Sequence, residues 1–112
     1  MLTVENLRAL GADVDDGIGR CLGDEAFYLQ MVRMVLEDPG FDGLREAIEN
    51  GDLDTAFDRA HALKGTLANV ALTSLADPMI EISEELRARR DMDYTELLDR
   101  IDRVLADYRG LL

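Results

Sequence analysis

One short segment combines three residue types that could handle a phosphoryl group. His61 is the only histidine of the 112 residues, and Lys64 and Gly65 follow it by three and four positions. An imidazole is largely neutral near pH 7 and offers a nitrogen lone pair that can attack phosphorus without a separate base. An ammonium one helical turn away can pair with the phosphoryl group on the ring. The segment therefore indicates phosphoryl-transfer chemistry.

The spacing of apolar residues places these three residues on the outer face of a helix. We expect this helix at residues 53–71, after the Asn50-Gly51 turn and the N-cap Asp52. Its inner stripe consists of apolar residues at helical spacing: Leu53, Ala56, Ala60, Leu63, Leu67 and Val70. His61 lies roughly opposite, with the outer-face neighbours Asp54, Phe57, Asp58, Lys64, Gly65 and Ala68.

Gly65 has two interpretations. A glycine in the middle of a helix costs about 1 kcal/mol relative to alanine, so a compensating benefit is expected. Gly65 and Ala68 either leave the imidazole accessible to a partner protein, or Gly65 is a packing notch for a neighbouring helix. In the second case His61 and Lys64 are ordinary surface residues. Asp54 or Asp58 could hold the other ring nitrogen of His61.

Composition limits the class of protein. The chain has 24 acidic and 12 basic residues, a net charge of −12, which disfavours binding to nucleic acid and anionic membranes. It has no apolar run of the roughly 20 residues that a membrane span needs, no signal-peptide pattern and one cysteine, Cys21, so we expect a cytoplasmic protein. The acidic residues show no EF-hand or H-E-x-x-H spacing, and we expect no metal site.

The remaining elements are also expected to be helices, because apolar residues recur at threes and fours throughout and never alternate. We predict a single all-α domain, residues 1–112, folded as an up-down antiparallel four-helix bundle with short N-terminal helices. The expected helices cover residues 3–10, 15–22, a segment from the N-cap Asp24 to the stop at Asp38-Pro39-Gly40, residues 41–48, a segment starting at Thr73 or Pro78 and ending in Arg87, Arg89 and Arg90, and a last segment from Asp93. Cys21 is expected to pack as a small apolar residue, and the methionines 31, 34, 79 and 92 as adaptable filler of the core or its rim.

The run from His61 to Val70, HALKGTLANV, resembles the signature of histidine-containing phosphotransfer (HPt) domains, H-x-L-K-G followed by small residues and an asparagine. The resemblance extends to size, acidity and helix order over nearly the whole chain. It implies phosphorylation of His61 through Nε2, with Lys64 near the phosphoryl group. Gly65, Ala68, Phe57 and Asp58 would then form the docking surface for a partner. Many family members have glycine two residues after the asparagine, where this chain has Ala71.

The resemblance further implies a phosphoryl carrier without kinase activity or a cofactor of its own. The expected partners are a response-regulator receiver domain, which would supply magnesium, and/or a hybrid histidine kinase; we expect a monomer. One alternative is an adaptor that binds receiver or kinase domains through the same face without being phosphorylated. Another is a phosphoacceptor module of a chemotaxis-type kinase, although the initial Met1 favours a free-standing protein.

Overall fold

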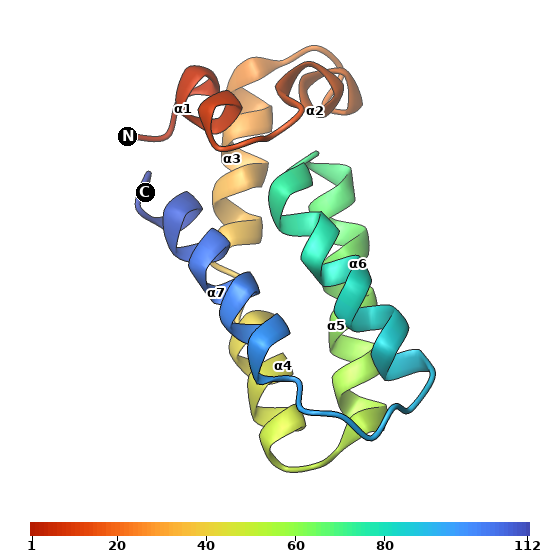
Figure 1. Ribbon diagram of the computed structural model, residues 1–112. Coiled ribbons are helices and arrows are strands. Elements are labelled where there is room, and N and C mark those ends of the chain that lie inside the picture. Colours follow the sequence, from red (N-terminus) through yellow and green to blue (C-terminus); the bar gives the residue numbers. More distant parts are fainter.

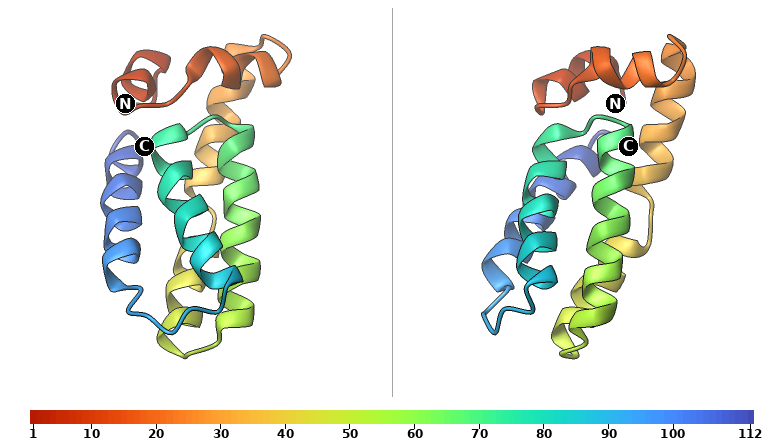
Figure 2. Two further views of the ribbon diagram at one scale, coloured as in Figure 1. Left: turned by 45° about the vertical axis from the view of Figure 1, so that its right-hand side comes forward. Right: turned by 90° about the vertical axis from the view of Figure 1, so that its right-hand side faces the viewer.

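The computed structural model describes all of residues 1–112 and contains seven α-helices and no strand. They are α1 (Val4–Ala9), α2 (Val14–Arg20), α3 (Glu25–Leu36), α4 (Gly40–Glu49), α5 (Leu53–Asn69), α6 (Thr73–Arg87) and α7 (Thr95–Arg109). Four antiparallel rods make the body of the molecule, one built from α3 and α4 end to end and the others from α5, α6 and α7 (Figure 1). The helices α1 and α2 lie across one end of these rods (Figure 2). The predicted bundle with short N-terminal helices is confirmed.

The rod formed by α3 and α4 is interrupted at Pro39. Asp38 accepts a hydrogen bond from the Gly40 amide through its side chain at 2.7 Å, and Pro39 occupies the N-cap position of α4. The last carbonyls of a helix lack intrahelical partners. One of them, on Leu36, accepts a 2.7 Å hydrogen bond from Nε of Arg109 in α7. A side chain from the neighbouring helix α7 therefore stabilises the interruption between α3 and α4.

The helix α6 begins at Thr73, the earlier of the two predicted starts. Pro78 lies inside the helix and is buried. At the other end, Arg89 donates to the Leu86 carbonyl at 3.3 Å, as expected for a cation that complements a helix C-terminus. Its neighbours in the basic cluster pair with acidic side chains: Arg87 with Glu84 at 3.5 Å and Arg90 with Glu85 at 2.9 Å.

The interior is mainly aliphatic, with three buried tyrosines, Tyr28, Tyr94 and Tyr108, and one buried phenylalanine, Phe41. Cys21 and Met79 are buried in it as expected, and Met31 is half-buried at its edge. The filler interpretation is wrong for Met34, which is 59% exposed because it points away from the buried stripe of α3. Met92 is 40% exposed and lies outside the core, at the rim of a cleft beside the connection from α6 to α7. None of the helices is both long enough and apolar enough to cross a membrane.

The α5–α6 turn has a defined geometry that the sequence pattern did not predict. The helix α5 ends at Asn69, two residues before the predicted end, and Ala71 adopts a left-handed conformation with φ +54°. The Ala71 amide donates to the Ala68 carbonyl and the Leu72 amide to the Leu67 carbonyl, both at 3.1 Å. This pair of bonds is a Schellman motif, which prefers glycine at the position of Ala71. The departure from the HPt pattern thus falls in a helix stop, not within the helix.

The N-terminal segment is bonded to this turn. The Asp13 amide donates to the Ala71 carbonyl at 2.9 Å, and the Tyr28 hydroxyl donates to the Val70 carbonyl at 2.9 Å. Gly17 in α2 lies under the Tyr28 ring, and a Cβ atom at Gly17 would overlap that ring. Residues before α3 therefore help to fix the end of α5.

A second joint connects α1 with α6 and α7. The Ser74 hydroxyl donates to the Leu10 carbonyl at 2.7 Å, and its oxygen lies 2.6 Å from that of Tyr108. Gly11 turns the chain beside it with φ +98°, and a Cβ atom there would lie only 3.0 Å from the Ser74 Cβ. Both features make glycine necessary at position 11.

Candidate functional site

The helix α5 is positioned by its cap and its buried stripe. Asp52 accepts hydrogen bonds from the Thr55 amide at 3.1 Å and from the Thr55 hydroxyl at 2.7 Å, and these bonds lower the pKa of the Asp52 carboxyl. The side chains that face the bundle are those predicted: Ala56, Ala60, Leu63, Leu67 and Val70 are buried and Leu53 is half-buried. His61 is exposed on the opposite face, as the periodicity requires.

Gly65 does not serve helix packing. A Cβ atom built at this position would meet no atom within 4 Å outside its own helix backbone, so the packing-notch interpretation is wrong. Ala68, on the next turn, is also exposed. The surface on the C-terminal side of His61 therefore carries almost no side-chain volume, and another molecule can approach the backbone there.

Lys64 is half-buried along its length and forms no ion pair with any carboxylate. Lysine commonly keeps its aliphatic stem against the protein and its ammonium in water. The charge at this edge of α5 is therefore not neutralised by the protein and is free to pair with an anion one turn from the imidazole.

The two aspartates considered as partners of the imidazole do not fill that role. Asp54 forms an ion pair with Arg89, which follows α6, and makes no ion pair or hydrogen bond with His61. Asp58 is exposed and makes no hydrogen bond to His61. Both carboxylates are close to His61 in sequence. Asp54 is instead held by Arg89, and Asp58 is exposed to solvent.

The imidazole of His61 instead lies against Phe57, one turn earlier in α5. The two ring centroids are 5.6 Å apart with an angle of 29° between the planes. Phe57 is half-buried and packs against the hydrophobic core, whereas His61 is exposed. One face of the imidazole is therefore covered by a ring that the core anchors.

Acidic residues are absent from two adjacent stretches, a feature that the sequence analysis missed. In a chain with 24 acidic residues, none occurs at positions 26–36 or 59–76. The first stretch lies in α3 and the second runs from α5 into α6; in Figure 2, α5 lies between the rod of α3 and α4 on one side and α6 on the other. The exposed surface of α3 includes the side chains of Phe27 and Met34, exposed by 44% and 59%. We call the exposed side chains of these two stretches the acid-free surface.

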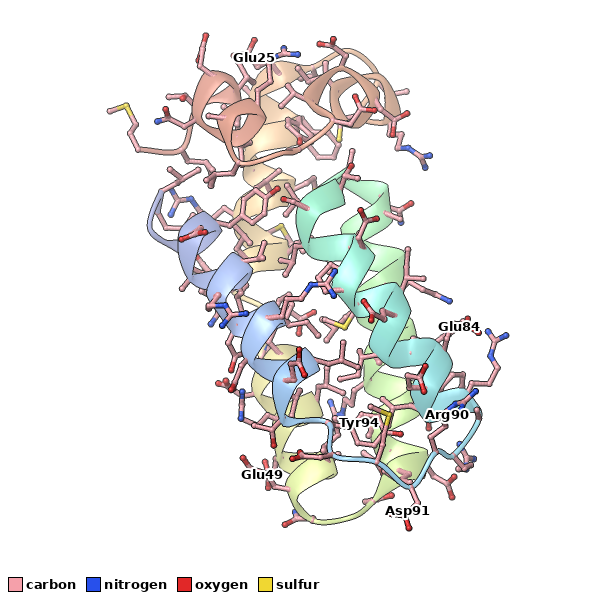
Figure 3. The ribbon with its side chains drawn as sticks, in the orientation of Figure 1. Glu25, Glu49, Glu84, Arg90, Asp91 and Tyr94 are labelled. Carbon is pink, nitrogen blue, oxygen red and sulfur yellow. The ribbon has the colours of Figure 1, made fainter.

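The largest cleft lies away from His61. It has a volume of about 530 Å³ and is bordered by the α4–α5 turn and the connection from α6 to α7, at the end of the bundle where Figure 3 labels Arg90, Asp91 and Tyr94. The Tyr94 hydroxyl donates there to the carbonyls of Arg90 at 2.9 Å and Glu85 at 3.3 Å, and burial raises the pKa of Tyr94. No group of three or more His, Cys, Asp or Glu side chains is placed to hold a metal ion. The chemistry-bearing residues are thus on an open surface.

Comparison with known proteins identifies the family of the chain. The family model of the Hpt domain matches residues 29–110, that is, from the first turns of α3 to just past the end of α7, and the match includes all of α5. No curated protein and no solved structure shows significant similarity. Since the match covers most of the 112 residues, the chain belongs to the Hpt domain family, whose domains carry phosphoryl groups on histidine in two-component signalling.

Proposed function

We propose that this protein is a phosphorelay carrier that accepts a phosphoryl group on His61 from a receiver-domain aspartate and donates it to another. The observation that carries the proposal is the exposed imidazole next to Gly65, where even a methyl group would have open space. Such access has no value for folding. It has value if the active site of a second protein must reach the ring.

The transfer step requires little from this chain. A nitrogen of the His61 ring, Nε2 in our proposal, attacks the phosphorus of an aspartyl phosphate; the new N–P bond forms as the P–O bond breaks, and the carboxylate leaves with the electron pair. The reverse step returns the phosphoryl group to a carboxylate. Alignment and charge neutralisation dominate the barrier of such reactions. Magnesium bound by the receiver domain would neutralise most of the charge, and the unpaired ammonium of Lys64 would contribute the remainder.

The docking surface would surround the ring. Gly65 and Ala68 would admit the loops of the receiver, and Phe57 and Asp58 would lie at the edge of the contact. The acid-free surface supports an acidic partner, because the active site of a receiver carries carboxylates and like charges repel across an interface. Either a response-regulator receiver domain or that of a hybrid kinase has this chemistry. We propose that the protein acts in the cytoplasm and as a monomer.

Phosphate labelling tests the assignment. Incubation with a phosphorylated receiver domain should place acid-labile, base-stable phosphate on the wild-type protein and none on His61→Gln. Labelling of that variant at the wild-type level would refute His61 as the acceptor. The Lys64→Gln variant should still be labelled, but more slowly by roughly three- to tenfold, the effect of removing one charge-assisted contact.

A further inference from the structure

The His61 imidazole has one aromatic neighbour, Phe57. No hydrogen bond and no ion pair reaches the ring, because Asp54 is engaged by Arg89 and Asp58 is turned to solvent. The ring instead stacks with Phe57, at 5.6 Å between centroids and 29° between planes. An exposed side chain without such a contact exchanges among several rotamers.

Helix geometry explains why these two rings meet. Side chains in an α-helix lean toward its N-terminus, so a residue covers the one that precedes it by four positions. His61 follows Phe57 by four positions, and Phe57 is itself held by packing against the core. The stack therefore restricts the motion of the exposed His61 side chain, because Phe57 is packed against the core. The Phe57 ring lies beside one face of the imidazole, and His61 as a whole stays exposed.

We propose that Phe57 is a positioning residue for phosphoryl transfer, which holds the imidazole of His61 in one orientation relative to the docked partner; this inference rests on the proposed function. In-line transfer requires the attacking nitrogen, the phosphorus and the leaving oxygen to be aligned, so a preset ring orientation raises the rate within the docked complex. This role is additional to the contact of Phe57 at the edge of the docking surface, because it acts on the transfer rate within the docked complex.

The orientation is measurable in the protein alone. In wild type, the carbon-bound ring protons of His61 should show ring-current shifts in the proton NMR spectrum and cross-relaxation with Phe57. Phe57→Leu keeps an apolar side chain but removes the ring, and should move both His61 signals toward random-coil positions. Phe57→Tyr should preserve the shifts. Identical His61 shifts in wild type and Phe57→Leu would overturn the proposal without any partner.

Transfer kinetics then separate positioning from docking. With a phosphorylated receiver domain that exchanges with wild type, Phe57→Leu should lower the rate at saturating receiver by roughly three- to tenfold, the factor that matches the worth of an aromatic pair. The half-saturating concentration should stay within about twofold, and Phe57→Tyr should restore the rate. A raised half-saturating concentration with an unchanged maximal rate would make Phe57 a docking residue and contradict our inference.

Two controls keep the outcomes distinct. Ile48→Ala removes a half-buried apolar side chain from α4 and reports any effect of weakened packing alone; its rate should equal that of wild type. Phosphoramidate, a small phosphoryl donor that needs no docking, should label wild type and Phe57→Leu alike. Failure to label wild-type His61 with phosphoramidate and with the receiver would reject the proposed function, whereas the NMR comparison would still decide whether Phe57 orients the ring.

Discussion

The hydroxyl of Tyr28 donates a 2.9 Å hydrogen bond to the backbone carbonyl of Val70, and so joins α3 to the end of the helix that carries His61. Tyr28 is fully buried, and its ring covers Gly17. The helix α5 is thus fixed at its C-terminal end by a phenol from a neighbouring rod and at its N-terminal end by the Asp52 cap.

Stability should fall at alkaline pH because of Tyr28. Burial, the largest cause, raises the pKa of Tyr28 from 10.0 to about 12. The folded chain therefore holds this proton more tightly than the unfolded chain, and the stabilisation is complete below pH 10 and is lost as the pH rises to about 12. Urea unfolding across this range, with tyrosinate absorbance recorded in parallel, measures the loss. Tyr28→Phe should cost about 1 kcal/mol at neutral pH and show a smaller alkaline loss. Equal alkaline losses in both proteins would contradict this assignment.

Gly65 should lower the stability of the fold while leaving His61 accessible to a partner. Gly65→Ala should raise the free energy of unfolding by roughly 0.5–1 kcal/mol, because the methyl group meets open space and glycine is a poor helix former. Gly19 in α2 has equally open surroundings and is the matched control. Gly65→Arg should abolish labelling by a receiver domain while Gly19→Arg leaves it unchanged, and both should unfold normally in urea.

The variants Gly65→Arg and His61→Ala together test the adaptor alternative. An adaptor that is never phosphorylated would lose partner binding in Gly65→Arg but keep it in His61→Ala, and wild type would acquire no phosphate. A carrier should acquire acid-labile phosphate that depends on both residues.

Replacing Ala71 with glycine should stabilise the fold. The left-handed conformation of a non-glycine residue costs roughly 1–2 kcal/mol, and loss of the buried methyl group of Ala71 offsets about 0.8 kcal/mol of that gain. Ala71→Gly should therefore raise the free energy of unfolding by up to about 1 kcal/mol, measured in urea. Ala71→Val, whose β-branch is worse in this conformation, should lower it; a stabilised valine variant would show that the turn rearranges.

The acid-free surface predicts the side from which a partner approaches. Met34→Glu places a carboxylate on the exposed surface of α3 and should raise the half-saturating receiver concentration roughly tenfold through repulsion and desolvation. Ile80→Glu adds the same charge to α6, where Asp77, Glu81 and Glu84 are already exposed, and should change it by less than about twofold. Because both side chains are exposed, thermal unfolding should change little. The reverse order of effects would place the receiver on the α6 side.

The parts of the site that follow from local periodicity could be predicted from the sequence. The buried stripe of α5 and the exposure of His61 are consequences of the helical repeat, and the Asp52 cap is a local hydrogen bond. What could not be predicted depends on contacts between distant residues. The ion pair that removes Asp54 from the imidazole comes from Arg89. The stop at Ala71 is fixed in part by the Asp13 amide, 58 positions earlier in the chain.

The Hpt match begins at Leu29, yet the bonds to the Val70 and Ala71 carbonyls come from Tyr28 and Asp13. A fragment trimmed to the matched residues would leave both carbonyls without their protein donors. It would also lack the ring of Tyr28 beside the turn. Sequence comparison thus delimits a shorter unit than the one that cooperates in folding. A transfer of this bundle into another protein should therefore include the first 28 residues, or the helix that carries His61 will fray from its carboxyl end.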